Sequence, residues 1–109
     1  MYTRDALLDL IRRSHQSLKG LMDHCRGFSS EELHRKLDGF GYETIQLQID
    51  HQIGAQAYWL SVIKGQMDAR DEPERYPTID ALEDHRMDVL AATEAYLEAT
   101  NDEALNTPA

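Results

Sequence analysis

The twenty residues from 44 to 63, "TIQLQIDHQIGAQAYWLSVI", constrain the fold more than any other part of the sequence. They contain no proline and one formal charge, on Asp50. On an α-helix with 3.6 residues per turn, the apolar side chains form two stripes on nearly opposite sides. The first stripe is Ile49, Ile53, Ala57, Leu60 and Ile63, and the second is Leu47, His51, Ala55, Tyr58 and Val62. A helix with two apolar sides must be covered on both, by its own bundle and by another helix, a second subunit or a ligand.

Helical spacing extends over the rest of the chain. Apolar residues at three- and four-residue steps predict long helices near 4–26, 43–65 and 78–100, and a short helix near 30–37. No segment has the alternation of a strand. We therefore expect an all-α protein, an antiparallel helical bundle that forms a single domain over residues 1–109. The predicted N-caps are Thr3, Ser29 or Ser30, Glu43 or Thr44, and Thr78.

Charge and cysteine content exclude several classes of protein. The net charge of −9 argues against a nucleic acid or an anionic membrane as partner, because phosphate groups require a basic surface. Cys25 is the single cysteine, so an intrachain disulfide is impossible. The N-terminus lacks the apolar run of a signal peptide, and the glutamines within 44–63 make that segment too polar to span a bilayer. These features predict a cytoplasmic protein.

The histidines leave two readings open. Alone on an apolar stripe, His51 is most simply a core histidine with one hydrogen-bond partner. However, His15 and His85 lie on or beside the apolar stripes of the other two long helices, and three inward histidines can bind one metal in a bundle core. His24 and His34 fall on polar faces. The spacing gives no further support, since the sequence has no HExxH, CxxC or histidine pair at i, i+4.

The segment "FSSEELHRKLDGFGYETIQLQIDHQIGAQAYWLSVIKG" resembles the DinB superfamily, which includes YfiT-like metal-dependent hydrolases and thiol-dependent transferases. The shared elements are Phe28–Leu33, the glycine-containing loop Gly39–Gly41, an early histidine at His51, and Ala57–Leu60. Their order and spacing, more than any one of them, make the resemblance specific. It covers essentially the whole chain.

The resemblance implies a four-helix bundle, usually a homodimer, with a divalent metal, often nickel or zinc, held by three histidines. The first ligand maps to His51. The other two would form an HxxxH pair on the fourth helix, and this sequence has no HxxxH and stops about where the connection to that helix would start. We therefore expect this chain to contain three long helices and one short helix and to be truncated before the fourth helix of the family's bundle. We expect tight metal binding only in the intact protein.

Two functions follow as expectations. The first is a DinB-like metal-dependent enzyme, a hydrolase or thiol-dependent transferase that acts on a small molecule. The alternative is a non-catalytic helical dimerisation module in which His51 is structural. The two stripes also predict a homodimer that buries Trp59 or Tyr58. We expect the His51 ring to point toward the bundle axis, where His15 and His85 would be the nearest partners.

Overall fold

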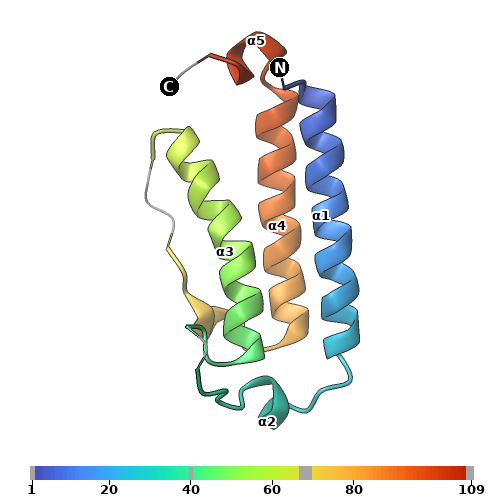
Figure 1. Ribbon diagram of the computed structural model, residues 1–109, viewed down its shortest axis with the longest axis vertical. Coiled ribbons are helices and arrows are strands. Elements are labelled where there is room, and N and C mark those ends of the chain that lie inside the picture. The colour runs from blue at the N-terminus through green and yellow to red at the C-terminus, as the bar shows by residue number, and fades with distance from the viewer. Residues whose placement is uncertain (1, 40, 67–69, 108–109) are drawn as a thin grey trace.

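The computed structural model describes residues 2–39, 41–66 and 70–107, and these ranges contain helices and no strand. The predicted all-α class is therefore confirmed (Figure 1). The three long helices are α1 (Arg4–Cys25), α3 (Ile45–Ile63) and α4 (Ile79–Glu98). The short elements are α2 (Ser30–Leu33), the 3-10 helix η1 (Pro73–Arg75) and α5 (Asp102–Leu105).

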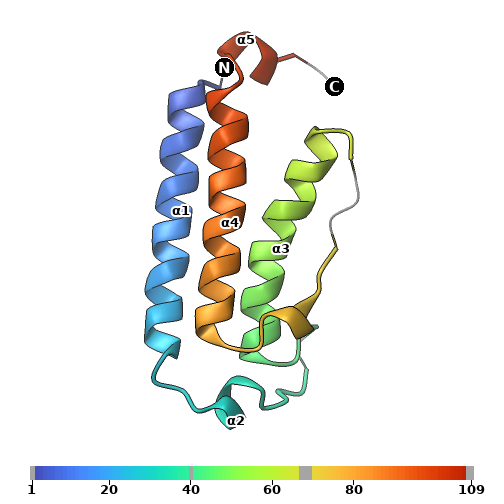
Figure 2. The same cartoon turned by 180° about the vertical axis from the view of Figure 1, so that it is seen from behind.

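Helix α4 lies between α1 and α3 in both views of the molecule (Figures 1 and 2). Helix α1 runs opposite to the other two. Helices α3 and α4 run in the same direction, because the connector that contains η1 returns to the end of the bundle where α3 begins. The two outer helices are thus held together mainly through α4, and residues 70–78 of the connector lie along the outer side of α3.

Local capping explains where the helices begin. The hydroxyl groups of Thr3, Thr44 and Thr78 each accept a hydrogen bond from the backbone N–H three residues later, at 3.0 to 3.1 Å. Ser29 does the same for α2 and forms a capping box with Glu32. These predicted caps are confirmed. Helix α2 is shorter than predicted, since it ends at Leu33 instead of position 37.

The polar tail after residue 100 contains a helix that the sequence did not reveal. Asn101 caps α5, which is tied to the start of the chain. The backbone N–H of Arg4 donates to Asp102 Oδ1 at 2.8 Å, and that of Tyr2 donates to Asn106 Oδ1 at 2.9 Å. Because these partners are about 100 positions apart, no local pattern could show that α5 folds over the end of the bundle.

The core forms where the three long helices and α2 meet. Ile49 and Ile53 of the first stripe are almost fully buried there, as the helical projection predicted. Leu21 of α1, by contrast, is 46% exposed. The buried apolar cluster consists of Met22, Cys25, Leu33, Ile49, Ile53, Ile79, Leu82 and Val89.

Within the described residues, none of the helices combines the length and apolar character that a membrane span requires.

Candidate functional site

His51 lies on the outer side of α3 and not at the bundle axis. Its side chain is 40% exposed and stacks on Tyr42, with ring centroids 4.0 Å apart and planes inclined by 18°. Its Nδ1 atom lies 3.2 Å from Oδ2 of Asp71. The predicted inward orientation is therefore wrong, because the loop before α3 and the connector after it both fold over this part of the second stripe.

Gly54 allows the connector to approach α3 at this point. An added Cβ at position 54 would overlap Oδ1 of Asp71, so the carboxylate occupies the space that any other residue would fill. One turn before His51, the side-chain amide of Gln46 donates to two backbone carbonyl groups of the connector, both at 2.9 Å. Together these contacts hold Asp71 against the imidazole.

The bond to Asp71 assigns the protons of the His51 ring. A carboxylate accepts hydrogen bonds and cannot donate them, so Nδ1 carries the proton and donates. In the neutral ring the lone pair is then on Nε2. A histidine that binds a metal typically donates its other ring N–H to a carboxylate or carbonyl group in this way. The contact with Asp71 thus leaves Nε2 of the neutral ring as the nitrogen with a free lone pair.

Asp50 lies next to His51 on α3, and its side chain is buried. It is 2% exposed, and its Oδ1 atom has no hydrogen-bond partner among the described residues. Burial raises the pKa of the Asp50 carboxyl, and the charges of Asp71 and Glu74 raise it further. Asp50 belongs to neither of the two apolar stripes of residues 44–63, and the sequence analysis did not predict this burial. The available signal was that Asp50 is the one charged residue between 44 and 63.

A second polar site, on the opposite flank of α3, contains His15. This residue is 4% exposed, and its two ring nitrogens contact different helices. Nδ1 lies 3.3 Å from Nη1 of Arg86, and Nε2 lies 2.8 Å from Oε1 of Gln56. A guanidinium group only donates, so Nδ1 accepts and Nε2–H donates to Gln56. Gln56 in turn donates to Oγ1 of Thr93 at 2.9 Å.

These contacts form a continuous polar chain across α1, α3 and α4. Arg86 is 6% exposed and is paired through two nitrogens with the carboxylate of Glu83. Burial lowers the pKa of His15; the hydrogen bond to Gln56 opposes that shift, and the charge of Arg86 adds to it. A neutral His15 is what the donor pattern requires. We call Glu83, Arg86, His15, Gln56 and Thr93 the crossbar.

The three stripe histidines do not converge. His15 belongs to the crossbar, His51 is paired with Asp71, and His85 stacks on Tyr76 with ring centroids 4.1 Å apart. Burial lowers the pKa of His85. No group of three or more His, Cys, Asp or Glu side chains within the described ranges is placed to hold a metal ion. The described residues thus do not form a complete metal site.

The remaining candidates are structural. Cys25 is 3% exposed, and burial raises the pKa of its thiol, which disfavours the reactive thiolate. His24 and His34 are exposed, as their polar faces predicted. His34 contacts the carbonyl oxygen of Pro77 through Nε2 at 2.8 Å, which links the loop after α2 to the start of α4.

A family model described as the DinB superfamily matches residues 10–109, which include α3, α4 and most of α1. The chain belongs to the DinB superfamily. The resemblance drawn from the sequence motifs is thereby confirmed. Neither the curated proteins nor the solved structures give a match to this chain. Membership supports the bundle fold and directs attention to His51, the DinB-like position at which the structure fixes the tautomer.

Proposed function

We propose that this DinB chain serves a metal-dependent enzyme, of the hydrolase or thiol-dependent transferase class, in which Nε2 of His51 is one ligand of a divalent ion such as nickel or zinc. The observation that supports this is the hydrogen bond from His51 Nδ1 to Asp71. Bound there with an open coordination position, such an ion would activate water or a thiol. The other ligands would be water, substrate or residues outside those described.

The chain's own residues orient this ligand. Asp71 fixes the tautomer and the ring plane of His51, and Tyr42 covers one face of the ring. Gly54 leaves room for the Asp71 carboxylate.

Removal of the imidazole tests this function. His51→Ala is expected to weaken zinc binding at least tenfold in calorimetric titrations, because it deletes the oriented ligand. His24→Ala is the matched control, since His24 is also on a helix but is exposed and is expected to leave the affinity unchanged. If His51→Ala binds zinc as tightly as the original chain, the metal assignment is wrong.

Gly54→Ala tests the orienting carboxylate in the same titration. Alanine normally stabilises a helix interior relative to glycine by about 0.5–1 kcal/mol, but here its Cβ displaces Asp71. We expect roughly tenfold weaker zinc binding with helicity retained. Gly20→Ala is the control, because nothing lies within 4 Å of a Cβ at position 20. Equal zinc affinity in both glycine variants would show that Asp71 does not support the ligand.

The helical dimerisation module is a second candidate function. The C-terminal part of the second stripe favours it, because Tyr58 and Val62 are not fully covered within the chain. The loop and the connector cover His51, but Tyr58 remains 41% exposed and Val62 is half-buried. A homodimer through Tyr58 and Val62 would cover this remainder, with His51 as a structural residue. Sedimentation velocity distinguishes the two states: a chain that stays monomeric at all concentrations counts against the module.

A further inference from the structure

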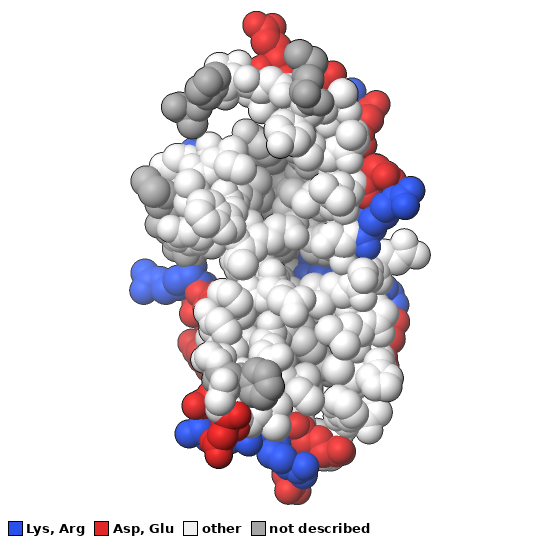
Figure 3. All heavy atoms as spheres, in the orientation of Figure 1, with Lys and Arg blue, Asp and Glu red and all other residues white. Residues whose placement is uncertain are grey.

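A pocket of about 900 Å³ lies between the ends of α1, α3 and α4 that are nearest to α5. Its walls are mostly apolar and include Leu7, Ile11, Trp59, Leu60, Tyr96 and Leu97. The middle of the face drawn in Figure 3 is largely uncharged, and acidic and basic side chains gather along its edges and ends. This is unexpected for a chain with a net charge of −9. His51 is not among the lining residues, so the pocket is distinct from the proposed metal ligand.

The pocket is short and is bounded at two ends. At one end lies α5, which is held to the start of α1 by the bonds from Arg4 to Asp102 and from Tyr2 to Asn106. At the other end lies the crossbar, whose members Gln56 and Thr93 line the pocket. Thr93 lies five residues before Glu98, the last residue of α4, or about 7.5 Å at 1.5 Å per residue, and Asn101 then caps α5.

These dimensions favour a small molecule over a helix. A packed helix lies along a groove of several turns, and α5 blocks one end of this groove after about one and a half turns of α4. Small-molecule sites typically have volumes of about 300–1,000 Å³, with apolar and aromatic walls and a few placed polar groups. The pocket has this volume and this type of wall.

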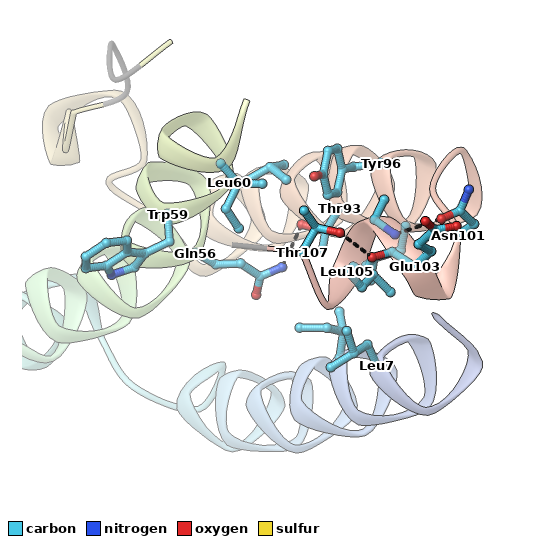
Figure 4. A pocket seen from close by; sticks show the side chains of 14 residues that line it. Leu7, Gln56, Trp59, Leu60, Thr93, Tyr96, Asn101, Glu103, Leu105 and Thr107 are labelled. Atoms are coloured by element: carbon cyan, nitrogen blue, oxygen red, sulfur yellow. Dashed lines mark hydrogen bonds between the residues drawn. The ribbon is translucent and has the colours of Figure 1, made fainter. Parts of the chain in front are cut away.

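Gln56 supplies a polar anchor at the inner end. Figure 4 shows its side chain reaching into the pocket from α3, on the same helix as Trp59 and Leu60. The amide has two N–H groups, of which one donates to Thr93. Its oxygen accepts from His15, which fixes the orientation of the amide. The second N–H has no partner among the described residues and is available to a hydrogen-bond acceptor on a ligand.

The charges around the pocket disfavour an anionic ligand. Glu103 is among the lining residues, and no lysine or arginine is among those that the structure describes. Arg86, the nearest cation of the crossbar, is already paired with Glu83. An anionic ligand would therefore meet a carboxylate at the wall without a free cation to compensate.

We propose that this pocket binds a neutral, largely apolar aromatic molecule, with its rings against Trp59 and Tyr96 and a carbonyl-type acceptor on Gln56. Burial of the rings provides most of the affinity. The hydrogen bond from the Gln56 N–H fixes the orientation of the bound molecule, with its acceptor group at the inner end of the pocket. This site is independent of the metal proposal, since no residue is shared between them.

Trp59 makes the test specific, because it is the single tryptophan of the chain and it lines the pocket. The probe is prodan, a neutral naphthalene ketone. We expect saturable one-to-one quenching of Trp59 emission and a blue shift of prodan emission. Ala104→Phe places a ring in the pocket from α5 and is expected to weaken binding at least tenfold. Ala91→Phe, on an exposed position of α4 outside the pocket, is expected to change nothing.

Several results would overturn the proposal. Quenching without saturation, or equal effects of the two phenylalanine variants, would show that the probe does not bind in the pocket. Anilinonaphthalene sulfonate, an anionic probe, is expected to bind at least tenfold more weakly; equal binding would refute the selection against anionic ligands. A dimer in sedimentation whose Trp59 is insensitive to prodan would identify a second copy as the occupant.

Discussion

Glu83→Gln is expected to lower the free energy of unfolding by about 3 kcal/mol, because it leaves the guanidinium of Arg86 buried without its countercharge. Arg86 is 6% exposed, and its remaining contact is His15, a neutral ring. For a domain of this size, the expected fall in Tm is roughly 12 °C or more. Urea unfolding followed by circular dichroism measures the change.

Two companion variants isolate the cause. Glu94→Gln removes a carboxylate from the same helix, but that carboxylate pairs with the exposed Arg12, so a far smaller effect is expected. The double variant Glu83→Gln/Arg86→Met removes both charges and is expected to regain most of the lost stability. If Glu83→Gln is no more destabilising than Glu94→Gln, the crossbar does not stabilise the bundle.

Leu82→Ala is expected to cost about 3 kcal/mol, within the range of about 2–5 kcal/mol for buried leucines. Leu82 is fully buried where the three long helices meet, so truncation leaves a cavity that its neighbours cannot close. Leu10→Ala is the control, because Leu10 is 60% exposed on α1 and its loss is expected to cost at most about 0.5 kcal/mol. Similar melting temperatures for the two variants would contradict the position of the core.

The long helices could be predicted from the sequence because their determinants are local. Thr3, Thr44 and Thr78 each precede a run of apolar residues with helical spacing, and each caps its helix in the structure. The inward position of Leu82 follows from the same spacing. Both features are properties of a single helix, so they can be predicted without knowing how the helices pack against one another.

Tertiary contacts could not be predicted in this way. The crossbar joins His15 to Arg86, 71 positions away, and α5 is held by contacts with the first residues of the chain. A helical projection predicted the inward side of His15 but could not name its partners. Arg86 is charged, and the projection alone would place it at the surface; its burial depends on Glu83 and His15, which the folded helices bring to it.

The error at His51 has the same origin. The helical projection identified its stripe correctly, but the expected cover was a helix, a second subunit or a ligand. In the structure the cover is Tyr42 from one loop and Asp71 from another. Gly54 lies outside both stripes, and it makes the close approach of Asp71 possible.

Long-range proton–nitrogen NMR spectra of the imidazole rings, recorded near pH 8 with and without zinc, test the assignment of His51 as a metal ligand most directly. We predict a proton on Nδ1 of His51 and a free Nε2 whose nitrogen signal moves when zinc is added. His15 provides the internal comparison, since its contacts with Arg86 and Gln56 require the opposite tautomer and exclude zinc. A His51 ring protonated on Nε2, or zinc shifts confined to His24 and His34, would contradict the assignment.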